Sequence, residues 1–229
     1  MSRKSAVVAI GGNSLIKDKQ HQSVRDQYIA AGETCWHVAS MIKDGWDVAI
    51  GHGNGPQVGF ILRRSELAAH ELHEVPLDVC GADSQGAIGY ALAQNLENDF
   101  HRLDVDRHAV AVVTGPDGHL HGVAAVIDKD FASSLLASRI GADTFIISTA
   151  VDRVALNWGQ PNQEWLDRMT AAEARAWLAE GGHFMPGSMA PKIEACLQFL
   201  DGGGHRAIIT RPELLERALH GHAGTLIEA

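Results

Sequence analysis

The chain has 229 residues, of which 45% are hydrophobic and 21% charged, so it can bury a substantial core without a disulfide or a structural metal. This composition lacks the charge excess and low complexity of disordered chains, and a globular enzyme is the expected class. The formal net charge is -9, with 28 acidic and 19 basic residues and no basic block. That balance argues against a broad positively charged surface for binding nucleic acid or anionic lipid. An anionic ligand would have to be attracted by a few charged groups close to its site.

Targeting signals and disulfides are not expected. The first ten residues hold two basic side chains but no apolar stretch of signal-peptide length, and no window of the sequence approaches a membrane span. Cys35, Cys80 and Cys196 are isolated and odd in number, which is typical of reduced thiols. These features predict a cytoplasmic protein.

Short apolar runs alternate with longer segments of helical period, the pattern of a mostly parallel sheet covered by helices. Strands are expected at residues 6–10, 47–50, 109–114, 144–148 and 206–210. Between the first two, apolar residues recur at steps of four and three from Val24 to Ile42, which predicts a crossover helix that ends at Gly45.

Polar residues mark two further helix starts and one boundary. Thr170 with Glu173, and Thr210 with Glu213, have the spacing of a capping box. The Gly-Pro-Asp-Gly turn at residues 115–118 predicts a boundary between an N-terminal lobe, residues 1–114, and a C-terminal lobe, residues 115–229.

Two glycine-rich loops each follow an expected strand. They are Gly11-Gly12-Asn13 and residues 51–57, which read Gly-His-Gly-Asn-Gly-Pro-Gln. Glycine lets backbone N–H groups approach a phosphate closely, and the carboxyl ends of strands are where open α/β sheets bind ligands. The second loop matches neither a Walker A motif nor the dinucleotide fingerprint, and either loop alone could be a tight turn. The two loops together favour an anion site.

Two lysines stand at expected helix starts. Lys129 lies between Asp128 and Asp130 at the start of an apolar helical segment, and Lys192 follows the glycine-containing loop at residues 183–191. Carboxylates are ordinary at a helix N-terminus, whereas a lysine there opposes the helix dipole unless an anion is bound nearby.

Metal and hydrolase chemistry find little support. Among the thirteen histidines, His70 and His73 are three residues apart and do not match H-E-x-x-H, so solvated histidines explain them better than a metal site. No G-x-S-x-G sequence is present, which leaves an α/β-hydrolase triad without support.

These segments, taken in order, resemble carbamate kinases. The resemblance is carried by residues 7–13, 51–59, 76–90, 125–130 and 186–192, and it extends over nearly the whole chain. It implies the amino-acid-kinase fold, a three-layer αβα sandwich with a mostly parallel central sheet. In that fold the N-terminal lobe holds the small substrate and the C-terminal lobe holds Mg²⁺ with ATP or ADP, normally in a homodimer.

The resemblance also implies a reaction, ATP plus carbamate giving ADP and carbamoyl phosphate, which can run toward ATP. Lys129 and Lys192 would neutralise the transferred group and Asp130 would orient them. The substrate would be held by Gly11, Gly12, Asn13, Gly51, Gly53 and Asn54, and Thr149, Asp152 and Met189 would lie near the nucleotide. Phosphoryl transfer asks mainly for positioning and positive charge, and carbamate is already an anion, so no general base is required.

Three features depart from the family's pattern. The family usually has Thr-Asp-Val-Asp at residues 149–152 and Gly-Ser-Met-Gly-Pro-Lys at residues 187–192, whereas this chain has Ala150 and Ala190. The third departure is larger, because the eight residues 115–122 stand where relatives carry a protruding subdomain that supplies a lid and a further lysine. Loss of a lid should weaken water exclusion.

Three functions stay open at this point. The first is an active carbamate kinase. The second is a non-catalytic protein that binds a nucleotide or an acyl phosphate, which the missing lid suggests. The third is a kinase for another small carboxylate or phosphate acceptor, since removal of the lid opens the substrate pocket.

Overall fold

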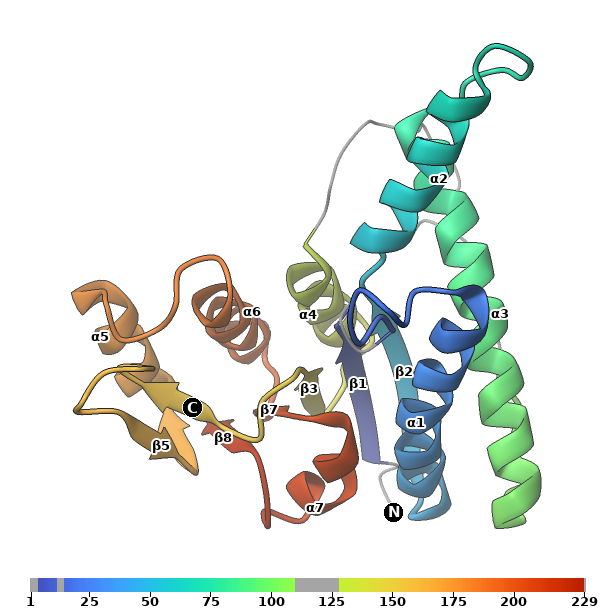
Figure 1. Ribbon diagram of the computed structural model, residues 1–229. Coiled ribbons are helices and arrows are strands. Elements are labelled where there is room, and N and C mark those ends of the chain that lie inside the picture. The colour runs from blue at the N-terminus through green and yellow to red at the C-terminus, as the bar shows by residue number, and fades with distance from the viewer. Residues whose placement is uncertain (1–3, 12–14, 110–127, 229) are drawn as a thin grey trace.

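The computed structural model describes residues 4–11, 15–109 and 128–228 (Figure 1). Within these residues, six strands form a central sheet in the order β2-β1-β3-β7-β8-β6. Neighbouring strands are parallel except for the antiparallel pair β7 and β8. The strands are β1 (Lys4–Ile10), β2 (Trp46–His52), β3 (Thr144–Ser148), β6 (Arg168–Thr170), β7 (Arg206–Thr210) and β8 (Thr225–Glu228). A separate antiparallel hairpin is formed by β4 (Val154–Leu156) and β5 (Glu164–Leu166).

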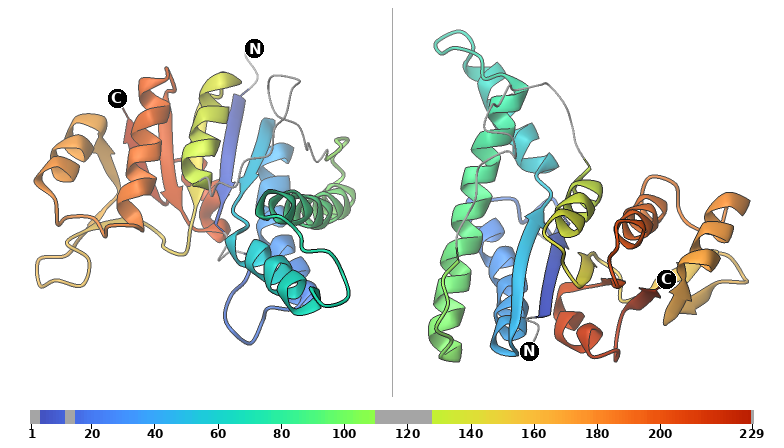
Figure 2. Two further views of the ribbon diagram at one scale, coloured as in Figure 1. Left: turned by 90° about the horizontal axis from the view of Figure 1, so that it is seen from above. Right: turned by 180° about the vertical axis from the view of Figure 1, so that it is seen from behind.

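Helices cover both faces of the sheet, as the two further views make clear (Figure 2). α4 (Lys129–Arg139) and α6 (Met189–Asp201) lie on one face, followed outward by α5 (Ala171–Glu180). α1 (Val24–Lys43) and α7 (Leu215–Leu219), which follows the 3₁₀ turn η2 (Pro212–Leu214), lie on the other. α3 (Leu77–Leu103) packs on the outer side of α1, and α2 (Gly55–Ala68) packs on α3. The prediction of an α/β sandwich with a mostly parallel sheet is therefore confirmed.

The alternation of side chains along the strands explains the three layers. Val7, Phe145 and Ile209 belong to the core beneath α4 and α6, whereas Val8 and Ile146 belong to the core beneath α1 and α7. Successive strand residues point to opposite faces, so a sheet covered on both sides needs continuous apolar strands. This is why the short apolar runs could be recognised as strands.

Capping residues fix several helix starts. The Thr170–Glu173 capping box forms as predicted, and Ser23 with Asp26 forms a second one at the start of α1. The predicted box at Thr210 is wrong. Thr210 is a buried residue of β7 whose hydroxyl bonds to the carbonyl of Asp152, and the chain enters η2 from Arg211 without a side-chain cap.

β1 joins the two ends of the chain in one sheet, because it pairs with β2 on one side and β3 on the other. Asp143 reinforces this junction by accepting hydrogen bonds from the backbone N–H and the hydroxyl of Ser5, at 2.9 and 3.0 Å. The predicted lobe boundary at residues 115–118, and residues 110–114 of the expected third strand, lie outside the described residues. The division at residue 114 stays a prediction.

Candidate active site

A buried carboxylate between two lysines forms the centre of the candidate site. The side chain of Asp130 is only 2% exposed, and it accepts a hydrogen bond from Lys129 Nζ at 2.5 Å on Oδ1 and from Lys192 Nζ at 2.7 Å on Oδ2. The two lysine side chains are 15% and 16% exposed, so their ammonium groups reach the surface from a largely desolvated setting. The structure thus brings together three residues that the sequence proposed as catalytic.

Local sequence explains how α4 presents this group. Asp128 caps the helix, and its Oδ1 accepts hydrogen bonds from the backbone N–H groups of Asp130 at 2.8 Å and Phe131 at 3.3 Å. The cap starts the helix at Lys129, so that Asp130 turns inward toward α6. Lys192 arrives from the N-terminal end of α6, which packs beside α4. Both helix N-termini therefore add favourable partial charge for an anion.

Burial changes the acid–base behaviour of the group. It lowers the pKa of Lys129, because desolvation disfavours the ammonium form, and the neighbouring Asp130 carboxylate only partly offsets this effect. One turn further along α6, burial raises the pKa of the Cys196 thiol and the nearby charge of Asp130 adds to the rise. Cys196 is consequently a neutral packing residue, and all three cysteines are buried and free.

A cleft of about 590 Å³ lies over this group. It opens at the carboxyl ends of β1, β3 and β7, where a parallel sheet gathers the residues that follow its strands. Its floor includes Gly11, Thr149 and Arg211, which come directly after those three strands. Its walls come from α1, α4 and α6, through Ala30, Glu33, Thr34, Asp128, Lys129, Asp130, Met189 and Lys192.

The glycine loops are built into the sheet. The N–H of Gly11 donates to the carbonyl of Ser148 at 3.2 Å, and the N–H of Gly53 donates to the carbonyl of Ile10 at 3.0 Å. Both groups are therefore engaged in the backbone ladder. Gly51 has a steric reason to be glycine, because a Cβ there would lie 2.2 Å from Ser133 Oγ of α4. Gly12 and Asn13 lie outside the part of the chain that the structure describes.

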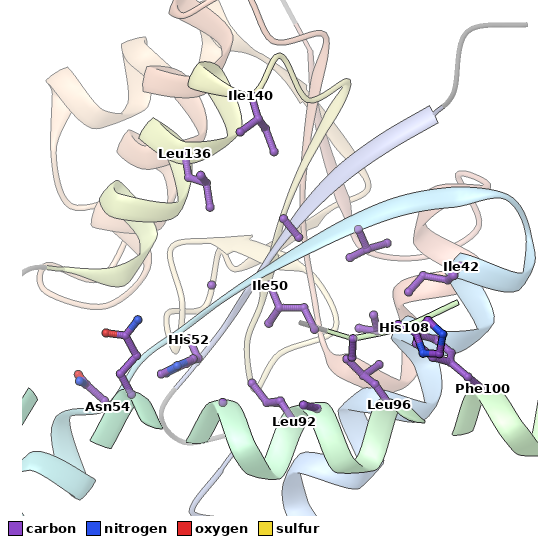
Figure 3. A pocket seen from close by; sticks show the side chains of 18 residues that line it. Ile42, Ile50, His52, Asn54, Leu92, Leu96, Phe100, His108, Leu136 and Ile140 are labelled. Atoms are coloured by element: carbon purple, nitrogen blue, oxygen red, sulfur yellow. The ribbon is translucent and has the colours of Figure 1, made fainter. Parts of the chain in front are cut away.

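Gly51 and Asn54 face a different space from Gly11. They line a largely apolar groove of about 680 Å³ between β2, α3 and α4, together with Leu92, Leu96 and Leu136 (Figure 3). Asn54 is anchored there, since its amide donates to Ser84 Oγ at 2.8 Å. His52 lies on the same wall; burial lowers its pKa, and its Nδ1 finds no hydrogen-bond partner among the described residues.

The residues predicted near the nucleotide are divided between two neighbouring spaces. Thr149 and Met189 line the cleft, whereas Asp152 lines an adjoining cavity of about 530 Å³. Arg211 borders both spaces and pairs with Asp152, with Nε 3.0 Å from Oδ1. Ala190, one of the departures from the family pattern, packs against the core beneath α6 rather than lining the cleft.

The structure adds site residues that the sequence did not reveal. Lys17, Glu33 and Thr34 line the cleft from the segment after β1 and from α1, and Arg211 and Glu213 line it from the end of β7. Arg211 could have been found, because the carboxyl ends of neighbouring parallel strands lie at one edge of the sheet. Lys17 gave no signal, since it belongs to no motif.

Among the described residues, no three His, Cys, Asp or Glu side chains are grouped so that they could hold a metal ion. The cleft carboxylates are mostly engaged: both oxygens of Asp130 bind lysines and one oxygen of Asp128 caps α4. This donor set fits a divalent ion delivered on the phosphates of a nucleotide better than a dedicated protein cage. Of the helices described, none is both long and apolar enough to cross a membrane.

Comparison with known proteins agrees with this geometry. The Amino acid kinase family model matches residues 4–211. The chain is 34% identical to the carbamate kinase-like protein YahI of Escherichia coli, over 98% of this chain and 99% of that protein, and 35% identical to the carbamate kinase of Halobacterium salinarum, over 96% and 97%. Among solved structures, the Giardia lamblia carbamate kinase bound to AMP-PNP superposes with a TM-score of 0.89 at 29% identity, covering 99% of both chains.

The same alignments confirm that this chain is short for its relatives. The alignment with the Escherichia coli protein has 314 positions and this chain has 229 residues, so at least 85 positions have no counterpart here. The predicted place of the shortening, residues 115–122, lies outside the described residues. Sequence, fold and cleft agree on one assignment: the chain belongs to the amino acid kinase family and is a kinase of its carbamate kinase group.

Proposed function

We propose that this protein transfers a phosphoryl group between ATP and carbamate, ATP + carbamate = ADP + carbamoyl phosphate, in either direction. The observation that carries the proposal is the Lys129–Asp130–Lys192 group in the wall of the cleft, in a chain related to carbamate kinases. The cleft offers ammonium groups and two helix N-termini, which suits a reaction that depends on charge stabilisation and positioning.

In this proposal the two lysines contact the transferred phosphoryl group. Each ammonium group donates one of its three N–H groups to Asp130, and its other two can donate to ligand oxygens. Asp130 is a positioning residue, because it is buried and holds both ammonium groups from behind. The partial desolvation of the lysines strengthens their attraction for an anion relative to that of a fully hydrated ammonium.

The small substrate would lie at the first glycine loop, held by Gly11, Gly12 and Asn13, with Gly53 beside that loop through its bond to Ile10. The predicted contacts of Gly51 and Asn54 lack support, because these residues line the neighbouring groove. Because the N–H groups of Gly11 and Gly53 bind the sheet, these two glycines would contribute close backbone approach rather than free donors. Carbamate carries its own negative charge, so the attack on phosphorus needs no general base.

The nucleotide would lie toward β3 and α6, with Thr149, Met189 and Asp152 beside it. Arg211 and Asp152 form an exposed ion pair at the junction of the cleft and the adjoining cavity. Mg²⁺ would arrive with the phosphates of ATP or ADP and neutralise part of their charge. Asp128 Oδ2, which accepts no hydrogen bond from the described residues, and Glu213, whose Oε2 lies 3.6 Å from Arg211 Nε, are cleft carboxylates that could contact its water shell.

The shortened chain supports a second candidate. The missing positions, at least 85 relative to the Escherichia coli protein, include enough chain for a lid, and an open cleft excludes less water. A protein that binds a nucleotide or acyl phosphate without turnover, or a kinase for a different carboxylate, would fit that observation.

The predicted homodimer and cytoplasmic location accompany the proposal as expectations, and light scattering during size-exclusion chromatography would test the dimer.

The test is ATP formation from ADP, Mg²⁺ and carbamoyl phosphate, followed by luminescence. ATP made by the purified protein and lost in Lys129→Ala and Lys192→Ala variants would support carbamate kinase activity. Nucleotide binding by calorimetry without turnover would favour the binding protein, and turnover only with another acyl phosphate would favour a different acceptor.

A further inference from the structure

The cleft contains four cations and four carboxylates among its described lining residues. The cations are Lys17, Lys129, Lys192 and Arg211, and the carboxylates are Glu33, Asp128, Asp130 and Glu213. A phosphorylated ligand brings several negative charges into this balanced set. Lys129 and Lys192 can contact an anion while they stay bound to Asp130, and a cation that exchanges its protein carboxylate for the ligand would add to their attraction.

Three of the four cations are poorly placed for such an exchange. Lys129 and Lys192 share a carboxylate that is almost fully buried, and leaving it unpaired would be costly. Arg211 faces two carboxylates, Asp152 at 3.0 Å and Glu213 at 3.6 Å. The Arg211 pairs are as exposed as an ordinary surface pair, at 45–55%, so what separates Arg211 from a cation with a single partner is that it has two carboxylates to leave.

Lys17 differs from the other three. Among the described residues it has one carboxylate partner, Glu33 of α1 at 2.5 Å, and the two side chains are 51% and 47% exposed. Ion pairs at this exposure contribute little free energy, and the four-carbon stem of lysine allows the ammonium group to move while its backbone stays in place. The pair can open without burying an unpaired charge.

The backbone around Lys17 is held in position. Leu15 is buried in the core beneath α1, and Asp18 closes a turn by accepting hydrogen bonds from the N–H groups of Gln20 and His21 at 2.7 and 3.0 Å. Lys17 lies between these two anchors and on the wall of the cleft. The backbone of Lys17 is therefore held in place, while its four-carbon side chain can turn its ammonium group toward a ligand that has bound in the cleft.

We propose that Lys17 is a third cation for the phosphoryl-bearing substrate: it leaves Glu33 when the ligand binds and contacts the ligand's phosphoryl oxygens. This inference rests on the proposed function, because it names a further residue of the same cleft. It assigns Glu33 the role of holding Lys17 at the wall of the cleft while the cleft is empty. A contact made with bound substrate and transition state alike acts on KM rather than on kcat.

The test compares Lys17→Gln with Lys19→Gln, a variant that removes the same charge from an exposed lysine two residues away, outside the cleft lining. Lys17→Gln is expected to raise the KM for carbamoyl phosphate about tenfold with kcat changed less than twofold, as the loss of one charge-assisted hydrogen bond predicts. Lys19→Gln should leave both within a factor of two. Equal KM values for the two variants would overturn the proposal.

Glu33→Gln separates a ligand contact from a structural ion pair. If Lys17 contacts the ligand, freeing it from Glu33 lowers KM, and the double variant Lys17→Gln/Glu33→Gln matches Lys17→Gln alone. If the ion pair only supports the fold, Glu33→Gln raises KM as much as Lys17→Gln does, and that result would reject the proposal.

Calorimetric binding of inorganic pyrophosphate extends the test to a protein without turnover. Weaker binding by Lys17→Gln than by Lys19→Gln would support the Lys17 contact even if the proposed reaction fails. Equal binding by both variants would reject it even in an active enzyme. If no variant binds pyrophosphate, the cleft is not an anion site and the inference falls together with the proposed function.

Discussion

Lys192 donates a hydrogen bond to Asp130 at 2.7 Å although 62 residues separate them in the chain. The bond joins the N-terminal ends of α6 and α4, two helices that pack side by side on the same face of the sheet. A site shared by two helix ends forms only when the helices are packed, so its geometry reports on the tertiary fold as well as on chemistry.

Replacing Asp130 should harm both stability and catalysis. Asp130→Asn leaves two partly desolvated ammonium groups without their counter-ion, and loss of one partner from a buried ion pair destabilises by about 3 kcal/mol. Misplaced lysines should lower kcat about 100-fold. Urea unfolding and the ATP-formation assay measure the two effects. Asp201→Asn, which breaks an exposed pair with Arg175, should change stability by less than about 1 kcal/mol.

The alkaline limb of the rate profile should depend on Lys129. Because burial lowers its pKa, Lys129 loses its charge at a lower pH than an ordinary lysine, whose pKa is 10.5. Activity should therefore fall as pH rises through the lowered pKa. Lys129→Arg keeps a positive charge to higher pH, so its activity should begin to fall at a higher pH, whatever the absolute rate of the variant. A limb at the same pH in both proteins would show that another group titrates.

Gly51 tests the contact between β2 and α4. Gly51→Ala places a Cβ 2.2 Å from Ser133 Oγ, and overpacking of this kind should destabilise by about 2 kcal/mol. A second change, Ser133→Ala, removes the clashing oxygen and should restore more than half of the loss. Gly59→Ala is the control, because its Cβ meets open space on α2 and should be neutral or slightly stabilising. Equal destabilisation by both glycine changes would contradict this packing account.

Asp143 should contribute stability that disappears in acid. The backbone N–H of Ser5 is the main cause that lowers the pKa of Asp143, and the Ser5 hydroxyl adds to it. Because the folded pKa lies below the ordinary value of 3.8, the contribution is present above that pH and is lost as pH falls through the folded pKa. Asp143→Asn should lower the unfolding midpoint by about 3 °C at neutral pH. The difference from the unchanged protein should shrink below pH 3.8, and an equal difference at pH 3 and pH 7 would contradict this account.

The central strands and the Lys129–Asp130–Lys192 group of the candidate site were predictable from the sequence. β3 and β7 have the predicted bounds and β1 and β2 extend theirs by a few residues, because strands buried on both faces read as continuous apolar runs. Lys129 and Lys192 were recognisable because a lysine is unexpected at a helix N-terminus. Asp130 stood out less, since a carboxylate at that place is ordinary.

Other features depend on contacts that a linear pattern does not contain. β4, β5 and β6 have three residues each, too short for periodicity to reveal them. Thr210 has capping-box spacing but is held in β7 by strand pairing, which outweighs the local preference. Lys17 joins the cleft only because Leu15 and the turn at Asp18 fold the segment after β1 against α1.

The most direct test of the account is the rate of ATP formation from ADP, Mg²⁺ and carbamoyl phosphate, measured for the unchanged protein and for Lys192→Ala. Lys192 lies on α6 and takes no part in strand pairing, so we expect the variant to fold. Circular dichroism checks that expectation. The account predicts measurable ATP formation that falls at least about 100-fold in the variant. Equal rates in both proteins, or no ATP from a folded unchanged protein, would contradict it.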